Sequence, residues 1–170
     1  HKTVDMKQLL GILVAVCCLT ACATTKTKEQ KEAEARQTFG QIADSVNNRS
    51  FTIELTYVIP RKLQPRFLTS DYSVRVHGDS ITSFLPYFGV AYRADMNSRY
   101  RSPLDFEGLI TDYSADWKKK KKMQVKMKTK NNMDYMTYSM DIFTNGTVTL
   151  DVIPTDREPI TFNGRLILNE

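Results

Sequence analysis

The segment from Met133 to Val152, MDYMTYSMDIFTNGTVTLDV, decides how this chain folds. On both sides of Asn145-Gly146, apolar residues alternate with polar ones, which is the period of a strand with one buried face. Asn-Gly between two such runs is the strongest short-range signal for a tight β-hairpin, because both residues tolerate the positive φ angles of the turn. The segment therefore predicts two antiparallel strands joined by a two-residue turn.

The same alternation continues through most of the chain after residue 50. The residues HGD at 77–79 separate YSVRV from SITSFL, which predicts a second hairpin. The run MQVKMKTK at 123–130 alternates without interruption, and ITFNGRLIL at 160–168 reads as a further strand. In FTIELTYVI at 51–59, the face that we expect to be buried holds Phe51, Ile53, Leu55, Tyr57 and Ile59.

Residues 31–50 have a different period. Ala35, Phe39, Ile42 and Val46 recur at intervals of three and four, which places them on one stripe of a helix that Asn47-Asn48 end. Strands that follow one another with short turns and no helix between them form an antiparallel meander. We therefore expect an α+β fold, with an N-terminal amphipathic helix against a strongly curved antiparallel β-meander, half-barrel or barrel-like, of roughly eight strands.

The N-terminal run MKQLLGILVAVCCLTAC at 6–22 has the order of a secretory signal: a positive start, a short apolar core and small residues before a cleavage point. Its end, Leu19-Thr20-Ala21-Cys22, resembles the box of bacterial lipoproteins, in which the cysteine is acylated and becomes the first residue. We expect residues 1–21 to be a signal peptide with upstream residues, 22–30 a lipidated tether, and 31–170 a single α+β domain.

This interpretation predicts a cell-envelope protein whose membrane partner is reached through the lipid anchor at Cys22. Ala23 is not acidic, which by similarity to lipoprotein sorting rules indicates the outer membrane. Residues 24–28 lack the acidic cluster typical of surface-exported lipoproteins of this kind, which indicates the periplasmic side.

The composition argues against several kinds of catalyst. All three cysteines lie at or before Cys22, so the domain can form neither a disulfide nor a thiolate metal site. Its one histidine, His77, lies in a predicted turn, where the geometry of a Ser-His-Asp site is hard to fix. No phosphate-binding loop occurs. We expect no catalytic residue, no metal and no cofactor. The enzymatic alternative is a small glycan-acting hydrolase with a carboxylate pair, for which the candidates are Asp105 with Glu107 and Asp112 with Asp116.

A run of five lysines, Lys118–Lys122, precedes Lys126, Lys128 and Lys130 on one face of the next predicted strand, and the chain carries a net charge of +5. Such a patch suits phosphate groups, but a protein outside the cytoplasm rarely meets nucleic acid, so we expect no nucleic-acid partner. Anionic lipids or acidic glycans are the candidate ligands. The alternative is a solvated turn beside a strand edge that lysines protect from pairing. The sequence predicts no particular protein partner.

The stretch between Phe84 and Trp117 is the least regular and most aromatic part of the strand region. Its LPYFGVAY at 85–92, with FEGLITDYS at 106–114 and REPITFNGRL at 157–166, resembles a family of small secreted lipoproteins of Bacteroides-type bacteria that is described as a domain of unknown function. The resemblance covers roughly residues 50–168. It implies a cellular setting and no activity.

The segment from Phe84 to Tyr100, which contains LPYFGVAY, is where we expect a ligand, if the protein binds one, at the place where the segment meets the concave face of the sheet. Pro86 and Gly89 predict a bend, at which the aromatic rings either fill the core or line the rim of a pocket. Tyrosine rings beside arginines suit ligands that have an apolar face and a carboxylate or sulfate. The candidate residues are Tyr87, Tyr92, Arg93, Arg99 and Tyr100. Together, these features favour a non-catalytic envelope lipoprotein, a binding or structural module of unknown ligand, over the hydrolase.

Overall fold

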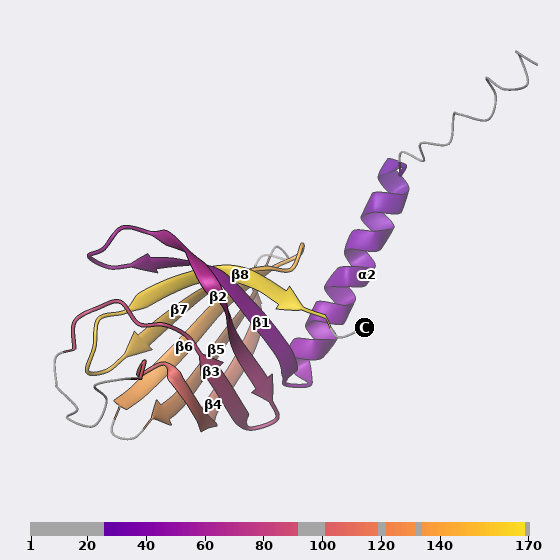
Figure 1. Cartoon of the computed structure of the whole chain (residues 1–170). Helices are drawn as coiled ribbons and strands as arrows, with labels where there is room; N and C mark the ends of the chain where they lie inside the picture. The colour runs from indigo at the N-terminus through magenta and orange to yellow at the C-terminus, as the bar shows by residue number, and fades with distance from the viewer. Residues whose placement is uncertain (1–25, 92–100, 119–121, 132–133, 169–170) are drawn as a thin grey trace, which may run out of the picture. The chain divides into compact units, whose positions relative to one another are not determined.

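One helix and eight consecutive strands make up the part of the chain that this computed structural model describes, residues 26–91, 101–118, 122–131 and 134–168 (Figure 1). The elements are α2 (Lys28–Asn47), β1 (Ser50–Pro60), β2 (Arg66–His77), β3 (Ser80–Phe84), β4 (Asp105–Lys118), β5 (Lys122–Asn131), β6 (Asp134–Phe143), β7 (Thr147–Pro154) and β8 (Ile160–Ile167). The chain divides into two units, His1–Ala33 and Glu34–Glu170, and the second holds every strand and the C-terminal part of α2.

Both ends of α2 are explained by local sequence. At its start, the hydroxyl of Thr27 accepts a hydrogen bond from the backbone N–H of Gln30 (3.4 Å), and the Gln30 side chain accepts one from the Thr27 N–H (3.0 Å). This reciprocal arrangement is a capping box. The helix ends at Asn47, as predicted, and the chain then reverses at Arg49, which has a positive φ of 50°.

The last turns of α2 pack against the strands. Ile42 and Val46, two residues of the predicted stripe, are 1 % and 0 % exposed and belong to the hydrophobic core. The Phe39 ring lies 4.4 Å from the Trp117 ring of β4, measured between centroids. The Tyr113 hydroxyl donates a hydrogen bond to the carbonyl of Val46 (2.7 Å), which also accepts one from the Arg49 N–H (3.1 Å), so β4 is tied to the end of the helix.

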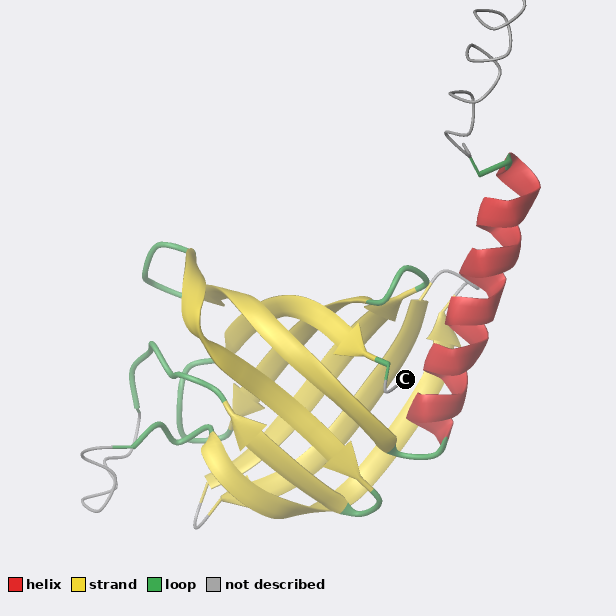
Figure 2. Ribbon diagram, turned by 45° about the vertical axis from the view of Figure 1, so that its right-hand side comes forward, coloured by secondary structure: helices red, strands yellow, loops and turns green. Residues whose placement is uncertain are grey.

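The eight strands form a closed antiparallel barrel in which each strand pairs with its neighbours in sequence and β1 pairs with β8 (Figure 2). This confirms the predicted α+β meander and resolves its curvature as full closure. Closure removes the two unpaired edges that an open sheet would expose. An eight-stranded barrel has an interior just wide enough to be filled by side chains or to hold one small ligand.

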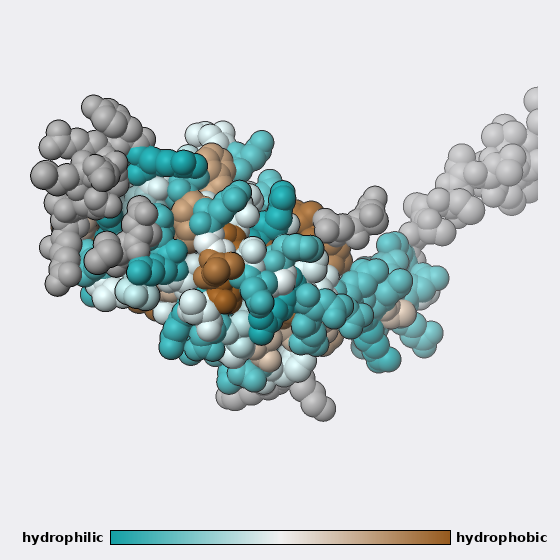
Figure 3. Space-filling model, turned by 90° about the horizontal axis from the view of Figure 1, so that it is seen from below, coloured by the Kyte–Doolittle hydropathy of each residue, from teal (hydrophilic) through white to brown (hydrophobic). Residues whose placement is uncertain are grey.

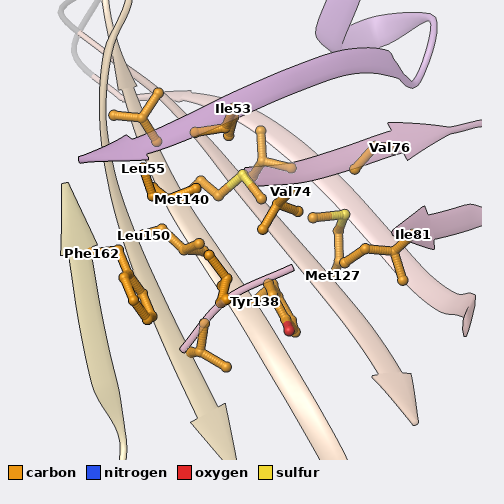
Figure 4. Close-up of a cluster of buried hydrophobic side chains, with 14 of the residues drawn as sticks. Ile53, Leu55, Val74, Val76, Ile81, Met127, Tyr138, Met140, Leu150 and Phe162 are labelled. Atoms are coloured by element: carbon orange, nitrogen blue, oxygen red, sulfur yellow. The ribbon is translucent and has the colours of Figure 1, made fainter. Parts of the chain in front are cut away.

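Side chains fill the barrel. Strand alternation sends one residue in two inward, and the largest inward side chains have less than 2 % of their surface exposed. Those of β1, β2, β3, β5, β6, β7 and β8 meet near the middle of the barrel (Figure 4). The residues that contact one another there include Ile53, Leu55, Val74, Val76, Ile81, Met127, Tyr138, Met140, Leu150 and Phe162.

Tyr138 is the large polar side chain in this interior, and its hydroxyl has a partner. The Ser83 hydroxyl donates to the carbonyl of Leu104 (2.7 Å) and lies 2.8 Å from the Tyr138 oxygen, so Tyr138 donates to Ser83. Burial raises the pKa of Tyr138 well above its usual value, which keeps the hydroxyl protonated and able to donate. The chain of bonds joins β6, β3 and the segment that precedes β4.

The turns form at the predicted places, but the β6–β7 turn has three residues, Thr144–Gly146, and not two, and in it only Gly146 has a positive φ. Gly146 (φ 85°) lies in the turn between β6 and β7, and Gly78 (φ 59°) lies between β2 and β3. The predicted inward face of β5 is buried as well. The predicted buried face of β1 is correct only as far as Leu55.

A bulge after Leu55 reverses the face of the second half of β1. The register with both β2 and β8 shifts between Leu55 and Tyr57. Val58 is consequently buried, whereas Ile59, predicted to be inside, is 37 % exposed. A bulge inserts an extra residue on one strand and so exchanges inward and outward positions beyond it.

The two ends of the barrel differ. At the helix end lie the start of β1, the β2–β3 and β6–β7 turns and the last turns of α2; at the loop end lie the β1–β2 and β7–β8 connections and the described residues between β3 and β4. On the face seen in Figure 3, hydrophilic side chains dominate and hydrophobic ones show only as small groups. Within the described residues, no helix combines the length and the apolar content needed to cross a membrane.

The filled interior predicts a large difference between two residues of β7. Leu150→Ala should lower the free energy of unfolding by about 2 to 5 kcal/mol, because it leaves a cavity among buried neighbours. Ile153→Ala, at a position that is 46 % exposed, should change it by less than about 1 kcal/mol. Urea unfolding of the two variants checks this, and equal losses would contradict a packed barrel.

Candidate functional site

The segment after β3 crosses the loop end of the barrel and closes it. Leu85 and Leu104 are 1 % and 0 % exposed, and the Leu85 N–H donates to the Leu104 carbonyl (3.2 Å). The Asn131 side chain donates to the carbonyl of Pro103 (2.9 Å). These contacts hold both described ends of the connection between β3 and β4 against the barrel.

Tyr87 is the one predicted ligand residue that the structure describes. Its hydroxyl lies 3.0 Å from the carbonyl oxygen of Glu158 and 3.2 Å from that of Val90, and it donates to these groups. The Arg157 guanidinium lies 5.8 Å from the centre of its ring. Tyr87 is half-buried and links the segment after β3 to the β7–β8 connection. The other candidates, which lie outside the described residues, are Tyr92, Arg93, Arg99 and Tyr100.

Glu158, which sequence analysis did not single out, is a buried carboxylate at this end. Its side chain is 4 % exposed and lies 2.8 Å from the Lys62 ammonium group. It also accepts a hydrogen bond from the Val90 N–H (3.3 Å). The hydrogen bond from Lys62 lowers the pKa of Glu158, and the Val90 N–H acts in the same direction, whereas burial opposes them.

A second ion pair lies nearby. Arg157 Nε donates to Asp134 Oδ2 (3.0 Å), and these side chains are 12 % and 14 % exposed. The other Asp134 oxygen, Oδ1, is buried without a hydrogen-bond partner. The two pairs fix the β7–β8 connection to β6 and to the β1–β2 connection. No sequence motif predicts these two ion pairs, because the partners of each pair are far apart along the chain.

The helix end carries an open cleft of about 360 Å³, here called the junction cleft, lined by Arg49, Asp79, Leu109, Ile110, Thr111, Asp112 and Tyr113. Arg49 bonds Asp79 (2.7 Å) and lies 4.5 Å from the centre of the Tyr113 ring. Burial raises the pKa of Tyr113 to about 12, so its hydroxyl stays protonated and bonded to the helix end. Sequence analysis did not predict this cleft, although it named Asp112.

The lysines of β5 face outward, as predicted, but several have acidic neighbours. Lys122 bonds Asp141 (2.6 Å), and Lys128 lies 3.5 Å from Asp112. Lys130 packs over the Tyr135 ring, 4.9 Å from its centre. The described part of this strand is therefore partly neutralised by the strands on either side.

The predicted carboxylate pairs lie on strand surfaces. Asp105 accepts two hydrogen bonds from Arg101, at 2.7 and 3.1 Å, and Glu107 is exposed on β4. His77 is exposed at the end of β2. Among the described residues, no group of three His, Cys, Asp or Glu side chains could hold a metal ion.

In the part of the chain that the structure describes, the fold is a small closed antiparallel barrel with a filled interior, preceded by one helix. Residues 33–166 match the sequence profile of a family described as a domain of unknown function, DUF4251. The match covers most of the chain, so the protein belongs to the DUF4251 family, as the resemblance in LPYFGVAY and the later strands predicted.

A solved structure agrees with the fold. A crystal structure of a DUF4251 family protein from Bacteroides eggerthii is similar with a TM-score of 0.57 and 15 % sequence identity. The similarity covers 78 % of this chain and 88 % of that one. A search of the curated proteins gives no significant match.

Glu158 provides a pH-dependent test of the loop end. Because its pKa is lower in the folded protein than in the unfolded chain, its ion pair stabilises the fold above the unfolded pKa, and this contribution disappears as the pH falls through the folded pKa. Glu158→Gln should therefore lower the melting temperature at neutral pH, and the difference from the parent should shrink below about pH 4.

Glu107→Gln is the control, since Glu107 is exposed on β4 and its variant should melt like the parent at every pH. Thermal unfolding followed by circular dichroism from acid to neutral pH measures all three proteins. A Glu158→Gln variant that melts like the parent at neutral pH would show that the buried pair does not stabilise the loop end.

Proposed function

We propose that this protein is a non-catalytic module of the cell envelope, anchored through acylated Cys22, that binds a ligand or partner with its outer surface. We place it on the periplasmic side of the outer membrane, on the sequence arguments from Ala23 and residues 24–28. Anionic lipids and acidic glycans are the ligand classes that its basic character suits.

The filled barrel is the observation that supports this proposal best. Barrels that carry small ligands keep a cavity among their inward side chains. Here Ile53, Tyr138, Leu150 and Phe162 are all 0 % exposed, and they lie in the middle of the barrel. An interior packed in this way leaves no room for a ligand among these side chains, so a ligand or partner has to bind at the ends of the barrel or on its outer face.

The glycan-acting hydrolase remains the second candidate because Asp79, Asp112 and Tyr113 line the same junction cleft. Glycoside hydrolysis needs one carboxyl group that holds a proton in an apolar setting and a second one that is ionised. Asp79 is 78 % exposed and bonded to Arg49, and Asp112 is 63 % exposed and near Lys128. Neither aspartate has the apolar setting of a general acid, which favours the non-catalytic proposal.

Membrane fractionation of the full chain in a Bacteroides host tests the anchor. Cys22→Ala should move the protein from the detergent phase to the aqueous phase, because one acyl-bearing residue supplies the anchor. Cys18→Ala, four residues earlier, should leave the protein in the detergent phase. A Cys22→Ala protein that is cleaved at the same residue as the parent and still partitions into the detergent phase would contradict acylation at this residue.

A further inference from the structure

The tip of the β1–β2 hairpin carries an exposed apolar group, here called the hairpin patch and defined as Ile59 of β1, Leu63 of the connection and Phe67 of β2. Their side chains are 37 %, 52 % and 79 % exposed. The Tyr57 ring, two residues before Ile59 in β1, packs edge-on against the Phe67 ring, with 5.0 Å between the ring centroids. Figure 1 shows this hairpin reaching past the neighbouring strands. A phenylalanine that is four-fifths exposed contributes nothing to the core.

Cations surround the hairpin patch. Arg61, Lys62 and Arg66 lie between or beside its members, and no Asp or Glu occurs from Leu55 to Ser70. The side chain of Lys62 is 70 % exposed even though it contacts Glu158. The hairpin therefore combines exposed apolar side chains with positive charge, and its own sequence supplies no acid to neutralise that charge.

The hairpin is held in position by the loop end of the barrel. Lys62 reaches the buried Glu158 (2.8 Å), and the Arg66 guanidinium lies over the Phe88 ring, 4.3 Å from its centre. Close to these contacts, the Glu158 N–H donates a hydrogen bond to the carbonyl of Val90 (3.0 Å), whose side chain is 51 % exposed. A surface that is fixed before it meets its partner loses less conformational freedom on binding.

The lysine strand also has exposed aromatic neighbours, Tyr135 beside Lys130 and Phe143 beside Lys122, but its charge is compensated to a greater extent. Lys122 and Lys128 have carboxylate neighbours in Asp141 and Asp112. The side chains between the lysines on the outer face of β5 are polar, as at Gln124. Both surfaces carry charge that is partly compensated, since Lys62 pairs with Glu158, and the hairpin patch differs because aliphatic as well as aromatic side chains are exposed among its cations.

We propose that the hairpin patch inserts into the headgroup region of an anionic phospholipid membrane. Phe67, Leu63 and Ile59 would lie at the boundary of the acyl chains, and Arg61, Lys62 and Arg66 would contact phosphate groups while their aliphatic stems cover apolar surface. Exposed aromatic and aliphatic residues flanked by basic ones are the composition of interfacial membrane contacts. This contact requires no acyl group, so it is separate from the anchor at Cys22.

The test uses the chain from residue 22 onward with Cys22→Ser, which carries no lipid but retains the entire compact unit Glu34–Glu170. Sedimentation with vesicles of phosphatidylethanolamine and phosphatidylglycerol should recover this protein, and neutral phosphatidylcholine vesicles should recover much less. The combined variant Leu63→Ala and Phe67→Ala should bind the anionic vesicles at least about tenfold more weakly, because two apolar side chains no longer enter the interface.

Two matched variants show whether the effect belongs to the hairpin patch. Phe143→Ala with Ile153→Ala removes exposed apolar residues elsewhere (38 % and 46 % exposed) and should leave vesicle binding unchanged. Lys126→Ala with Lys130→Ala removes charge from the lysine strand and should weaken binding much less than the hairpin variant. A second readout places Phe67→Trp in a Trp117→Phe background, where brominated acyl chains should quench the new tryptophan.

Several results would overturn the proposal. The proposal is wrong if the parent protein does not bind anionic vesicles, or if the hairpin variant binds them as tightly as the parent does. It is also wrong if vesicle binding is lost in the lysine variant. Loss of a dimer in analytical ultracentrifugation of the hairpin variant without vesicles, together with unchanged vesicle binding, would assign the patch to a second copy of the chain. Equal melting temperatures of parent and variant exclude misfolding as the cause. Failure here leaves the Cys22 anchor untouched, since that is measured by detergent partition.

Discussion

The close approach of β8 to β1 at Gly164 is the constraint on which the rest of the structure depends. Gly164 pairs with Leu55 across the seam that closes the barrel. A Cβ atom added at Gly164 would lie 2.9 Å from the Cα of Leu55 and closer still to the carbonyl group of Glu54. These are backbone atoms and cannot rotate away as a flexible side chain can. Any side chain here would force the first and last strands apart, and both would become unpaired edges.

Closure has consequences at both ends of the barrel. The hydrophobic core continues to both ends of the barrel. Ile42 and Val46 of α2 cover the helix end, and Leu85 and Leu104 cover the loop end. The charged groups at the loop end then tie connections to one another: Glu158 joins the β1–β2 and β7–β8 connections through Lys62. This is how a barrel whose described inward side chains are buried presents a rigid, basic and partly apolar hairpin to its surroundings.

The alternation of apolar and polar residues and the residue types of turns are local features. The structural features that depend on them can therefore be predicted from the sequence. The faces of β5, the turn at Asn145-Gly146 and the end of α2 follow from short stretches. The bulge after Leu55 is not local, because it depends on register with two partner strands, and so Ile59 was predicted on the wrong face. Closure between β1 and β8 and the pairing of Glu158 with Lys62 likewise join residues far apart in sequence.

The candidate site shows the same division. A bend near Pro86 and aromatic residues around it were predictable, and the structure places the Tyr87 ring between two connections of the loop end. The exposure of Phe67 was not predictable from the sequence, because it depends on the bulge after Leu55 and on the register of β1 with β2 and β8. The sequence carries the charge and the apolar residues, and only the fold decides which of them face solvent.

Gly164→Ala, measured by urea unfolding with Gly40→Ala as the control, tests most directly whether closure at the seam organises this protein. Gly40 lies in α2 with no atom within 4 Å of an added Cβ, so its replacement should be neutral or stabilise the protein by up to about 1 kcal/mol. Gly164→Ala should lower the free energy of unfolding by about 2 to 3 kcal/mol, because the new methyl group meets backbone that cannot move without parting β1 from β8. A Gly164→Ala protein as stable as the parent would contradict the account.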